Sequence, residues 1–165
     1  MNSKIRLVYL LVVLALALGL AAGASAAAAR IVVTGKEIPL CYSDPPHPDC
    51  TYGEWSFPDG NQHVRNMVQV YQVICSDPRV VGVNTLVANA NWDADGLGPG
   101  WGTFHHQPAT ISDGYWEGTF SAMMTADGYV SRIVGQGYGA LEGLFYTATE
   151  VNGEFEGVIL ELPTR

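Results

Sequence analysis

Residues 115–140, YWEGTFSAMMTADGYVSRIVGQGYGA, decide the fold class of this chain. Two stretches rich in β-branched and aromatic residues flank the dipeptide Asp127-Gly128, and neither sustains a helical period. Asp-Gly is a hairpin dipeptide because it tolerates the positive φ that a tight antiparallel turn needs. The pattern therefore predicts two antiparallel strands, over residues 115–125 and 129–140.

The same pattern extends outward over most of the chain. Asp113-Gly114 and Asn152-Gly153 are further hairpin dipeptides, and a proline-rich loop is expected over residues 39–62. Eight strands connected mostly by tight turns predict an all-β sandwich or a closed antiparallel barrel, and we favour the barrel because closure removes exposed strand edges. Such a barrel is either filled by side chains or holds one small ligand. The other six strands are expected over residues 30–38, 63–75, 80–92, 100–107, 144–151 and 154–162.

The first 26 residues have the pattern of a cleavable signal peptide. Lys4 and Arg6 precede the apolar run 7–20, and the small-residue sequence Ala24-Ser25-Ala26 provides a cleavage site. We expect a secreted or periplasmic protein with no membrane span after cleavage, whose residues 27–165 form a single β-barrel domain.

The charge of the predicted mature chain is strongly acidic. Loss of Lys4 and Arg6 takes the eight basic residues of the full chain to six, against 16 acidic residues, which gives a net charge of −10. A surface of this sign repels nucleic acid and anionic lipid, so we expect neither as a partner.

Three cysteines lie in a chain predicted to enter an oxidising compartment, where disulfides persist. Cys41 and Cys50 bracket the proline-rich sequence YSDPPHPD, and we favour a bridge between them over either pairing with Cys75. Cys75 ends an apolar strand and has no Cys-His signature around it, so we expect a small buried hydrophobic residue rather than a nucleophile.

The sequence GQGYGA, residues 135–140, has the spacing of a dinucleotide-binding fingerprint. That fingerprint must open a helix, whereas the residues that follow here are β-branched and aromatic. We interpret Gly135, Gly137 and Gly139 as same-face glycines where a strand bends or lies beneath a large aromatic side chain. No cofactor is expected.

A calcium site is a weaker interpretation of residues 91–102. Asn91, Asp93, Asp95 and Gly96 occupy the first, third, fifth and sixth positions of a calcium-binding loop. Position twelve is Gly102 instead of a bidentate Glu, and the flanking segments are strands. Asn, Asp and Gly also suit a wide β-turn, so the stretch is chiefly a predicted hairpin tip.

Five other residues are candidates for site chemistry. Glu117 and His105 are candidate proton-transfer groups if they face the lumen, although alternation favours a solvent-facing Glu117 with Trp116 and Phe120 turned inward. Arg65, Tyr71 and Tyr138 lie mid-strand and are candidate ligand-binding residues, or simply amphipathic residues of the barrel wall.

Several of these stretches resemble the allene oxide cyclase barrel group, a set of calycin-like barrels that also includes the plant dirigent proteins. The similarity lies in SDPRVVGVNTLVANANWDADGLGPGWGTF, GYWEGTFSA and GQGYGALEGL, all within residues 76–144, and more loosely in NQHVRN. The resemblance implies an eight-stranded antiparallel barrel with a lumen, and a tendency to form homo-oligomers. It transfers no catalytic residue to this chain.

Three functions remain open. The chain is predicted to bind a small lipophilic molecule or a surface partner, which is the interpretation we favour. The first alternative is a cyclase or isomerase that acts on a lipophilic intermediate inside the lumen. The second is a structural exported domain with a filled barrel. An enzyme needs an ionisable group that faces an open lumen, whereas a passive binder needs only apolar walls.

Overall fold

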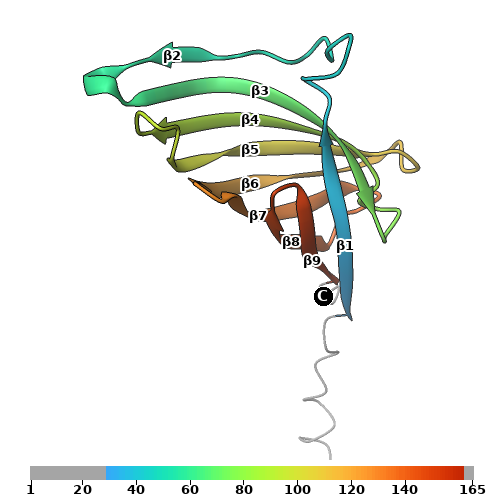
Figure 1. Ribbon diagram of the computed structural model, residues 1–165. Coiled ribbons are helices and arrows are strands. Elements are labelled where there is room, and N and C mark those ends of the chain that lie inside the picture. Colours follow the sequence, from blue (N-terminus) through green and yellow to red (C-terminus); the bar gives the residue numbers. More distant parts are fainter. Residues whose placement is uncertain (1–28, 162–165) are drawn as a thin grey trace, which may run out of the picture.

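The computed structural model describes residues 29–161, so the predicted signal peptide lies outside the described residues. This part of the chain is an antiparallel sheet of nine strands with one short 3-10 helix, η1, and no α-helix. Figure 1 shows the strands wrapped into a barrel-like shape. The strands are β1 (Ala29–Pro39), β2 (Glu54–Ser56), β3 (Gln62–Cys75), β4 (Gly82–Trp92), β5 (Gly98–Pro108), β6 (Gly114–Thr125), β7 (Gly128–Gly139), β8 (Leu144–Val151) and β9 (Glu154–Glu161).

Eight of the strands close into a ring. Their order is β1-β9-β8-β7-β6-β5-β4-β3, and β3 pairs with β1 to complete the circle. Every pairing is antiparallel. The ring confirms the predicted eight-stranded antiparallel barrel.

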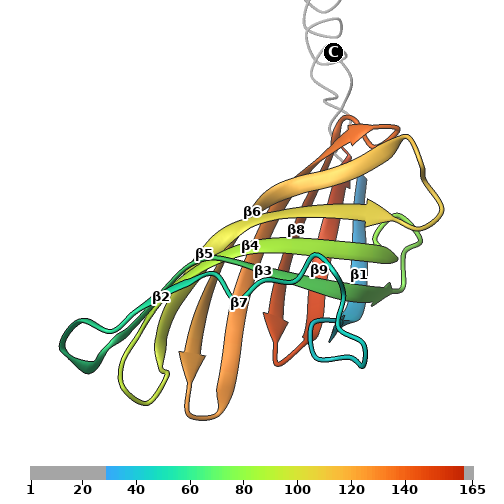
Figure 2. The same ribbon diagram turned by 90° about the horizontal axis from the view of Figure 1, so that it is seen from above.

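One end of the barrel flares because β1 divides its pairing between two neighbours. Most of β1 pairs with β9, and only its last residues, 35–39, pair with residues 71–75 of β3. Near its start, β3 pairs instead with the short strand β2. The hairpins β2–β3, β4–β5 and β6–β7 project past the β8–β9 hairpin and define this flared end (Figures 1 and 2).

Side chains fill the opposite, closed end. Trp116 is only 1% exposed, and its indole Nε1 donates a hydrogen bond of 2.8 Å to the carbonyl oxygen of Arg79. The buried core around Trp116 also contains Val33, Val73, Val80, Phe104, Ile133, Leu141, Tyr146, Ala148, Phe155 and Ile159. Because this core is tightly packed, space for a ligand remains at the flared end.

The hairpin turns follow the prediction with one correction. Gly128 has a positive φ of 121°, and Asn152 and Gly153 have φ values of 51° and 88°. Neither Asp113 nor Gly114 has a positive φ, so the expected reason for glycine at this turn was wrong. A Cβ on Gly114 would lie 2.9 Å from the Ile111 side chain, so close packing is the reason for glycine here.

Glycines inside β6 and β7 make room for one aromatic ring. A Cβ on Gly135 would lie 2.6 Å from Cζ of Phe104, and a Cβ on its register partner Gly118 would lie 2.7 Å from Cε1 of the same ring. The interpretation of a glycine beneath a large aromatic side chain is confirmed at Gly135.

The expected loop over residues 39–62 contains two elements that the sequence pattern did not reveal. They are β2, which pairs with residues 63–65 of β3, and η1 (Pro58–Gly60). Only three residues of β2 pair with the sheet, so the strand has no alternating pattern long enough to detect.

Candidate functional site: the cavity at the flared end

The barrel contains a cavity of about 260 Å³ that extends toward the flared end. This volume exceeds the roughly 150 Å³ of an engineered apolar cavity that binds benzene, and lies just below the roughly 300 Å³ at which typical small-molecule sites begin. Its apolar lining is Met67, Leu86, Ala88, Ala90, Trp92, Gly100, Phe104, Phe120, Ala122, Met124 and Ile133. Its polar lining is Glu37, Tyr42, Gln69, Tyr71, Asn84, Asn89, Tyr129, Ser131 and Glu150.

A row of small side chains creates this space. Ala90, Gly100, Ala122 and Ser131 are direct register partners across β4, β5, β6 and β7, and Glu150 of β8 continues the row. Side chains directly opposite each other on adjacent strands share one face of the sheet, so the small residues leave one band of the inner wall unfilled.

Two carboxyl groups give the cavity a polar side. Glu37 accepts a hydrogen bond of 2.9 Å from Nδ2 of Asn84. Glu150, which is 4% exposed, accepts one of 2.5 Å from the hydroxyl of Tyr129. Both groups line the cavity, and none of the described side chains that line it is Lys or Arg.

Burial changes the ionisation of both carboxyls. It is the main cause that raises the pKa of Glu37 to about 7, and repulsion from Glu150 adds to the effect. Burial also raises the pKa of Glu150, although the hydrogen bond from Tyr129 opposes that rise. Glu37 therefore exchanges its proton near neutral pH, in the range where a general acid or base is effective.

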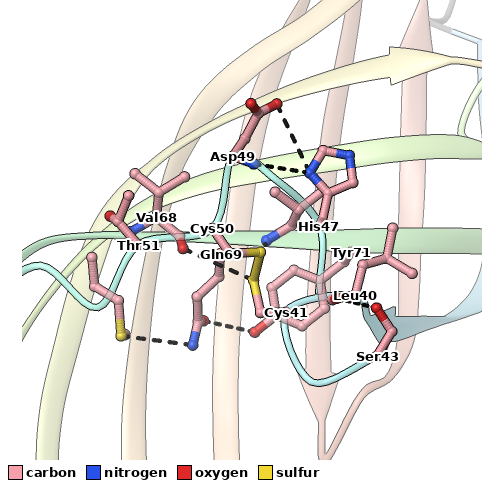
Figure 3. Close-up of a disulfide and its surroundings, with 12 residues drawn as sticks. Leu40, Cys41, Ser43, His47, Asp49, Cys50, Thr51, Val68, Gln69 and Tyr71 are labelled. Atoms are coloured by element: carbon pink, nitrogen blue, oxygen red, sulfur yellow. Dashed lines mark hydrogen bonds and ion pairs between the residues drawn. A yellow bond between two sulfur atoms is a disulfide. The ribbon is translucent and has the colours of Figure 1, made fainter. Parts of the chain in front are cut away.

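Tyrosines on neighbouring elements complete the polar side. Tyr71 donates a hydrogen bond of 2.7 Å to Oε1 of Gln69, as Figure 3 shows. Burial raises the pKa values of Tyr71 and Tyr129, so both hydroxyls remain protonated donors. Of the three residues predicted to bind a ligand, Tyr71 is the one that lines the cavity.

Next to Glu37 lies a smaller void of about 20 Å³, lined by Glu37, Asn84 and His106 among others. This volume suffices for about one water molecule. His106 is 4% exposed, and burial lowers its pKa to about 4, so its imidazole is neutral at pH 7. Oδ1 of Asn84 and Nε2 of His106 are buried without a hydrogen-bond partner.

Glu117 and His105 lie on the outer face of the barrel, which corrects the hypothesis of lumen-facing proton-transfer groups. Their side chains are about half exposed, and Nδ1 of His105 lies 3.3 Å from Oε1 of Glu117. Trp116 and Phe120 point inward, as alternation favoured. Adjacent strand residues face opposite sides of a sheet, so His106, rather than His105, is the inward histidine.

Tyr138 is also on the outer surface, where it is 37% exposed and stacks on Tyr115 with ring centroids 5.2 Å apart. Arg65 does not line the cavity. Its guanidinium donates bonds of 2.7 Å to the carbonyl oxygen of Ala90 and to Oδ1 of Asn91, and it lies over the ring of Trp101. These contacts give Arg65 a structural role in the sheet.

The calcium-like stretch forms a hairpin tip between β4 and β5. Oδ1 of Asp93 accepts hydrogen bonds from the backbone N–H groups of Asp95 and Leu97, at 3.0 and 2.9 Å. Asn91 is engaged by Arg65. These residues therefore bond to the protein itself, as expected for Asx-type turn residues. Across residues 29–161, no three His, Cys, Asp or Glu side chains gather to hold a metal ion.

The disulfide predicted between Cys41 and Cys50 is confirmed, with Cα atoms 5.6 Å apart (Figure 3). Sγ of Cys41 accepts a hydrogen bond of 3.2 Å from the backbone N–H of Val70, which ties the loop to β3. Tyr42, next to the bridge, lines the cavity, so the disulfide also holds one edge of the site. Cys75 is a free, partly buried thiol packed against the core.

Sequence reasoning missed Glu37, Asn84, Tyr129 and Glu150. One signal was available for the two acids: Glu37 shares parity with Val33 and Gly35, and Glu150 with Tyr146 and Ala148. That parity places each acid on the inward face of its strand. Acidic residues are rarely buried, so parity alone is a weak signal of burial at both positions.

Comparison of the chain with protein-family models, with curated proteins and with solved structures found no match in any of the three. Among residues 29–161 there is no helix with the length and hydropathy needed to cross a bilayer. The fold of the described residues is a nine-stranded antiparallel sheet in which eight strands close into a barrel-like ring.

Proposed function

We propose that this protein is an exported β-barrel that binds a small lipophilic molecule in the cavity at its flared end. The observation that carries the proposal is the 260 Å³ cavity, with mostly apolar walls and one polar side. This combination is typical of ligand sites, because apolar walls supply affinity and a few polar groups fix orientation. The cavity favours a binder over the alternative of a filled structural barrel.

The resemblance to the allene oxide cyclase and dirigent barrels supports the same proposal, since those barrels enclose lipophilic molecules in a lumen. The export signal predicted in residues 1–26 supports a secreted or periplasmic location. Within this proposal the ligand enters from the flared end, because the core around Trp116 fills the closed end.

Blocking the cavity tests the proposal. Ala122 lines the cavity, whereas its neighbour Ser121 is exposed on the outer face. We expect the neutral probe 3-phenyl-1-propanol to bind the wild-type protein in titration calorimetry, and Ala122→Phe to weaken its binding at least tenfold. Ser121→Phe, the matched outward variant, should bind like the wild type. If Ala122→Phe remains folded and binds the probe unchanged, the cavity is not the binding site.

Glu37 favours a second candidate, a cyclase or isomerase that acts in the same cavity. A carboxyl with a pKa of about 7 can both accept and donate a proton at neutral pH. The test is exchange of the activated C–H protons of phenylacetone in deuterated water, followed by NMR. Exchange faster than in the Glu37→Gln and Ala122→Phe variants would support proton transfer by Glu37. Equal rates in all three proteins would leave simple binding as the function.

A further inference from the structure

The polar side of the cavity presents hydrogen-bond acceptors and negative charge. Glu37 and Glu150 are carboxyls. Asn84 also lines the cavity; it is 6% exposed, and its Oδ1 is buried without a hydrogen-bond partner. The amide Nδ2 of Asn84 is already used by Glu37, and the hydroxyls of Tyr129 and Tyr71 donate to Glu150 and Gln69. The carboxylate oxygens of Glu37 and Glu150 are therefore the acceptors that this side of the cavity offers to a ligand.

Among the described residues of the cavity lining, no basic side chain neutralises these two carboxylates. None of the described residues that line the cavity is Lys or Arg, and Arg65 is engaged by backbone carbonyls and Asn91. The neighbouring His106 is neutral, because burial holds its pKa at about 4. Buried carboxylates without a counterion are costly, and a ligand cation that forms charge-assisted hydrogen bonds would offset that cost.

The remaining lining matches an apolar organic skeleton. Leu86, Phe104, Phe120 and Ile133 supply apolar contacts, and aromatic rings also attract a nearby ligand cation. One buried donor, Nε1 of Trp92, also lacks a partner, but it lies at the other end of β4 from Asn84. The full chain carries a net charge of −8, which concentrates cations around the protein.

We propose that the cavity selects a small lipophilic amine, whose ammonium group docks between Glu37 and Glu150 while its apolar body occupies the aromatic part of the cavity. This inference rests on the proposed function, because it names the ligand class of the same site. It disfavours fatty acids and other lipophilic carboxylates as ligands, since a third carboxylate there would be repelled by Glu37 and Glu150.

Three probes with one carbon skeleton test the head group: 3-phenylpropylamine, 3-phenyl-1-propanol and 3-phenylpropionate. By titration calorimetry at pH 8 we expect the amine to bind at least tenfold more tightly than the alcohol, and the carboxylate to show no binding. At pH 5.5 the preference for the amine should shrink, because Glu37, whose pKa is about 7, becomes protonated. Burial raises the pKa values of Tyr71 and Tyr129 and lowers that of His106 to about 4, so these three groups stay neutral in this pH window while Glu37 titrates.

Proton release gives an independent readout. At pH 7 Glu37 is about half protonated, so docking of an ammonium group should release about half a proton per amine from this residue. Calorimetry in two buffers with different ionisation enthalpies measures that release, and the alcohol should release none. Glu37→Gln and Glu150→Gln should each weaken the amine at least tenfold and leave the alcohol within twofold. Glu117→Gln, on the outer face, should change neither.

The outcomes separate the two proposals. If the alcohol binds as tightly as the amine in the wild-type protein, the amine inference is overturned and the lipophilic binding site stands. The same conclusion follows if Glu37→Gln weakens both probes equally. If none of the three probes binds, the proposed function and the amine inference both fall.

Discussion

Replacement of Glu37 by Gln should make the protein more resistant to rising pH. Burial raises the pKa of Glu37 from 4.5 to about 7, so between these values the folded protein holds a proton that the unfolded chain releases. The free energy of unfolding of the wild type should therefore fall as pH rises through this window. At 1.36 kcal/mol for each pH unit, the loss from Glu37 is about 3 kcal/mol.

Glu37→Gln removes this loss. At pH 5 the wild-type side chain is protonated, so Gln replaces a neutral group of similar size and the two proteins should have similar stability. At pH 8 the wild type buries a carboxylate beside Glu150, and the variant should be more stable by about 3 kcal/mol. Urea unfolding at pH 5, 6, 7 and 8, with tryptophan fluorescence as the signal and the disulfide intact, measures the difference.

A matched surface change provides the control. Glu156 is exposed on β9, so Glu156→Gln should change stability by less than about 0.5 kcal/mol at every pH. If the difference between Glu37→Gln and the wild type is the same at pH 5 and pH 8, Glu37 is not a buried titrating group. A variant that loses stability toward pH 8 would refute the reasoning outright.

Three further substitutions test the contacts that hold the loops and strands around the cavity, each by its effect on the free energy of unfolding in urea. Cys41→Ser combined with Cys50→Ser should cost about 3 kcal/mol, because the bridge closes a loop with a sequence separation of 9; an unchanged midpoint would show that the loop needs no bridge. Gly135→Ala should lower the free energy of unfolding by about 1–3 kcal/mol because the added Cβ meets the ring of Phe104, and by much less in a Phe104→Ala background. An equal loss in both backgrounds would show that the clash is not with Phe104. Asp93→Ala should lower the free energy of unfolding by about 1 kcal/mol, because two turn hydrogen bonds are lost, and the loss should be the same in calcium and in chelator. A loss that depends on calcium would instead indicate a metal site.

Local sequence patterns determined most of the barrel. Alternation and the hairpin dipeptides around residues 115–140 located the strands, and all eight predicted strands begin within two residues of where the structure begins them. Strand β4 is among these, with Gly82 as its first residue in place of residue 80. These signals are visible because strand periodicity and turn chemistry depend on residues near one another in the chain.

The disulfide was predictable for the same local reason. Cys41 and Cys50 are close in sequence and lie in a loop with few core residues, so their pairing needed no knowledge of distant strands. By contrast β2 was missed, because its three paired residues depend on a partner strand and carry no period of their own.

Only the tertiary structure decided the chemistry of the cavity. Glu37 comes from β1, Asn84 from β4, Tyr129 from β7 and Glu150 from β8, and closure of the ring brings them around one space. Glu117 was a candidate because it lies mid-strand between Trp116 and Gly118, yet the pleat turns it to solvent beside His105. Local patterns determine which residues form strands, whereas the pKa of a carboxyl depends on the distant groups and the excluded water around it, which only the closed barrel brings together.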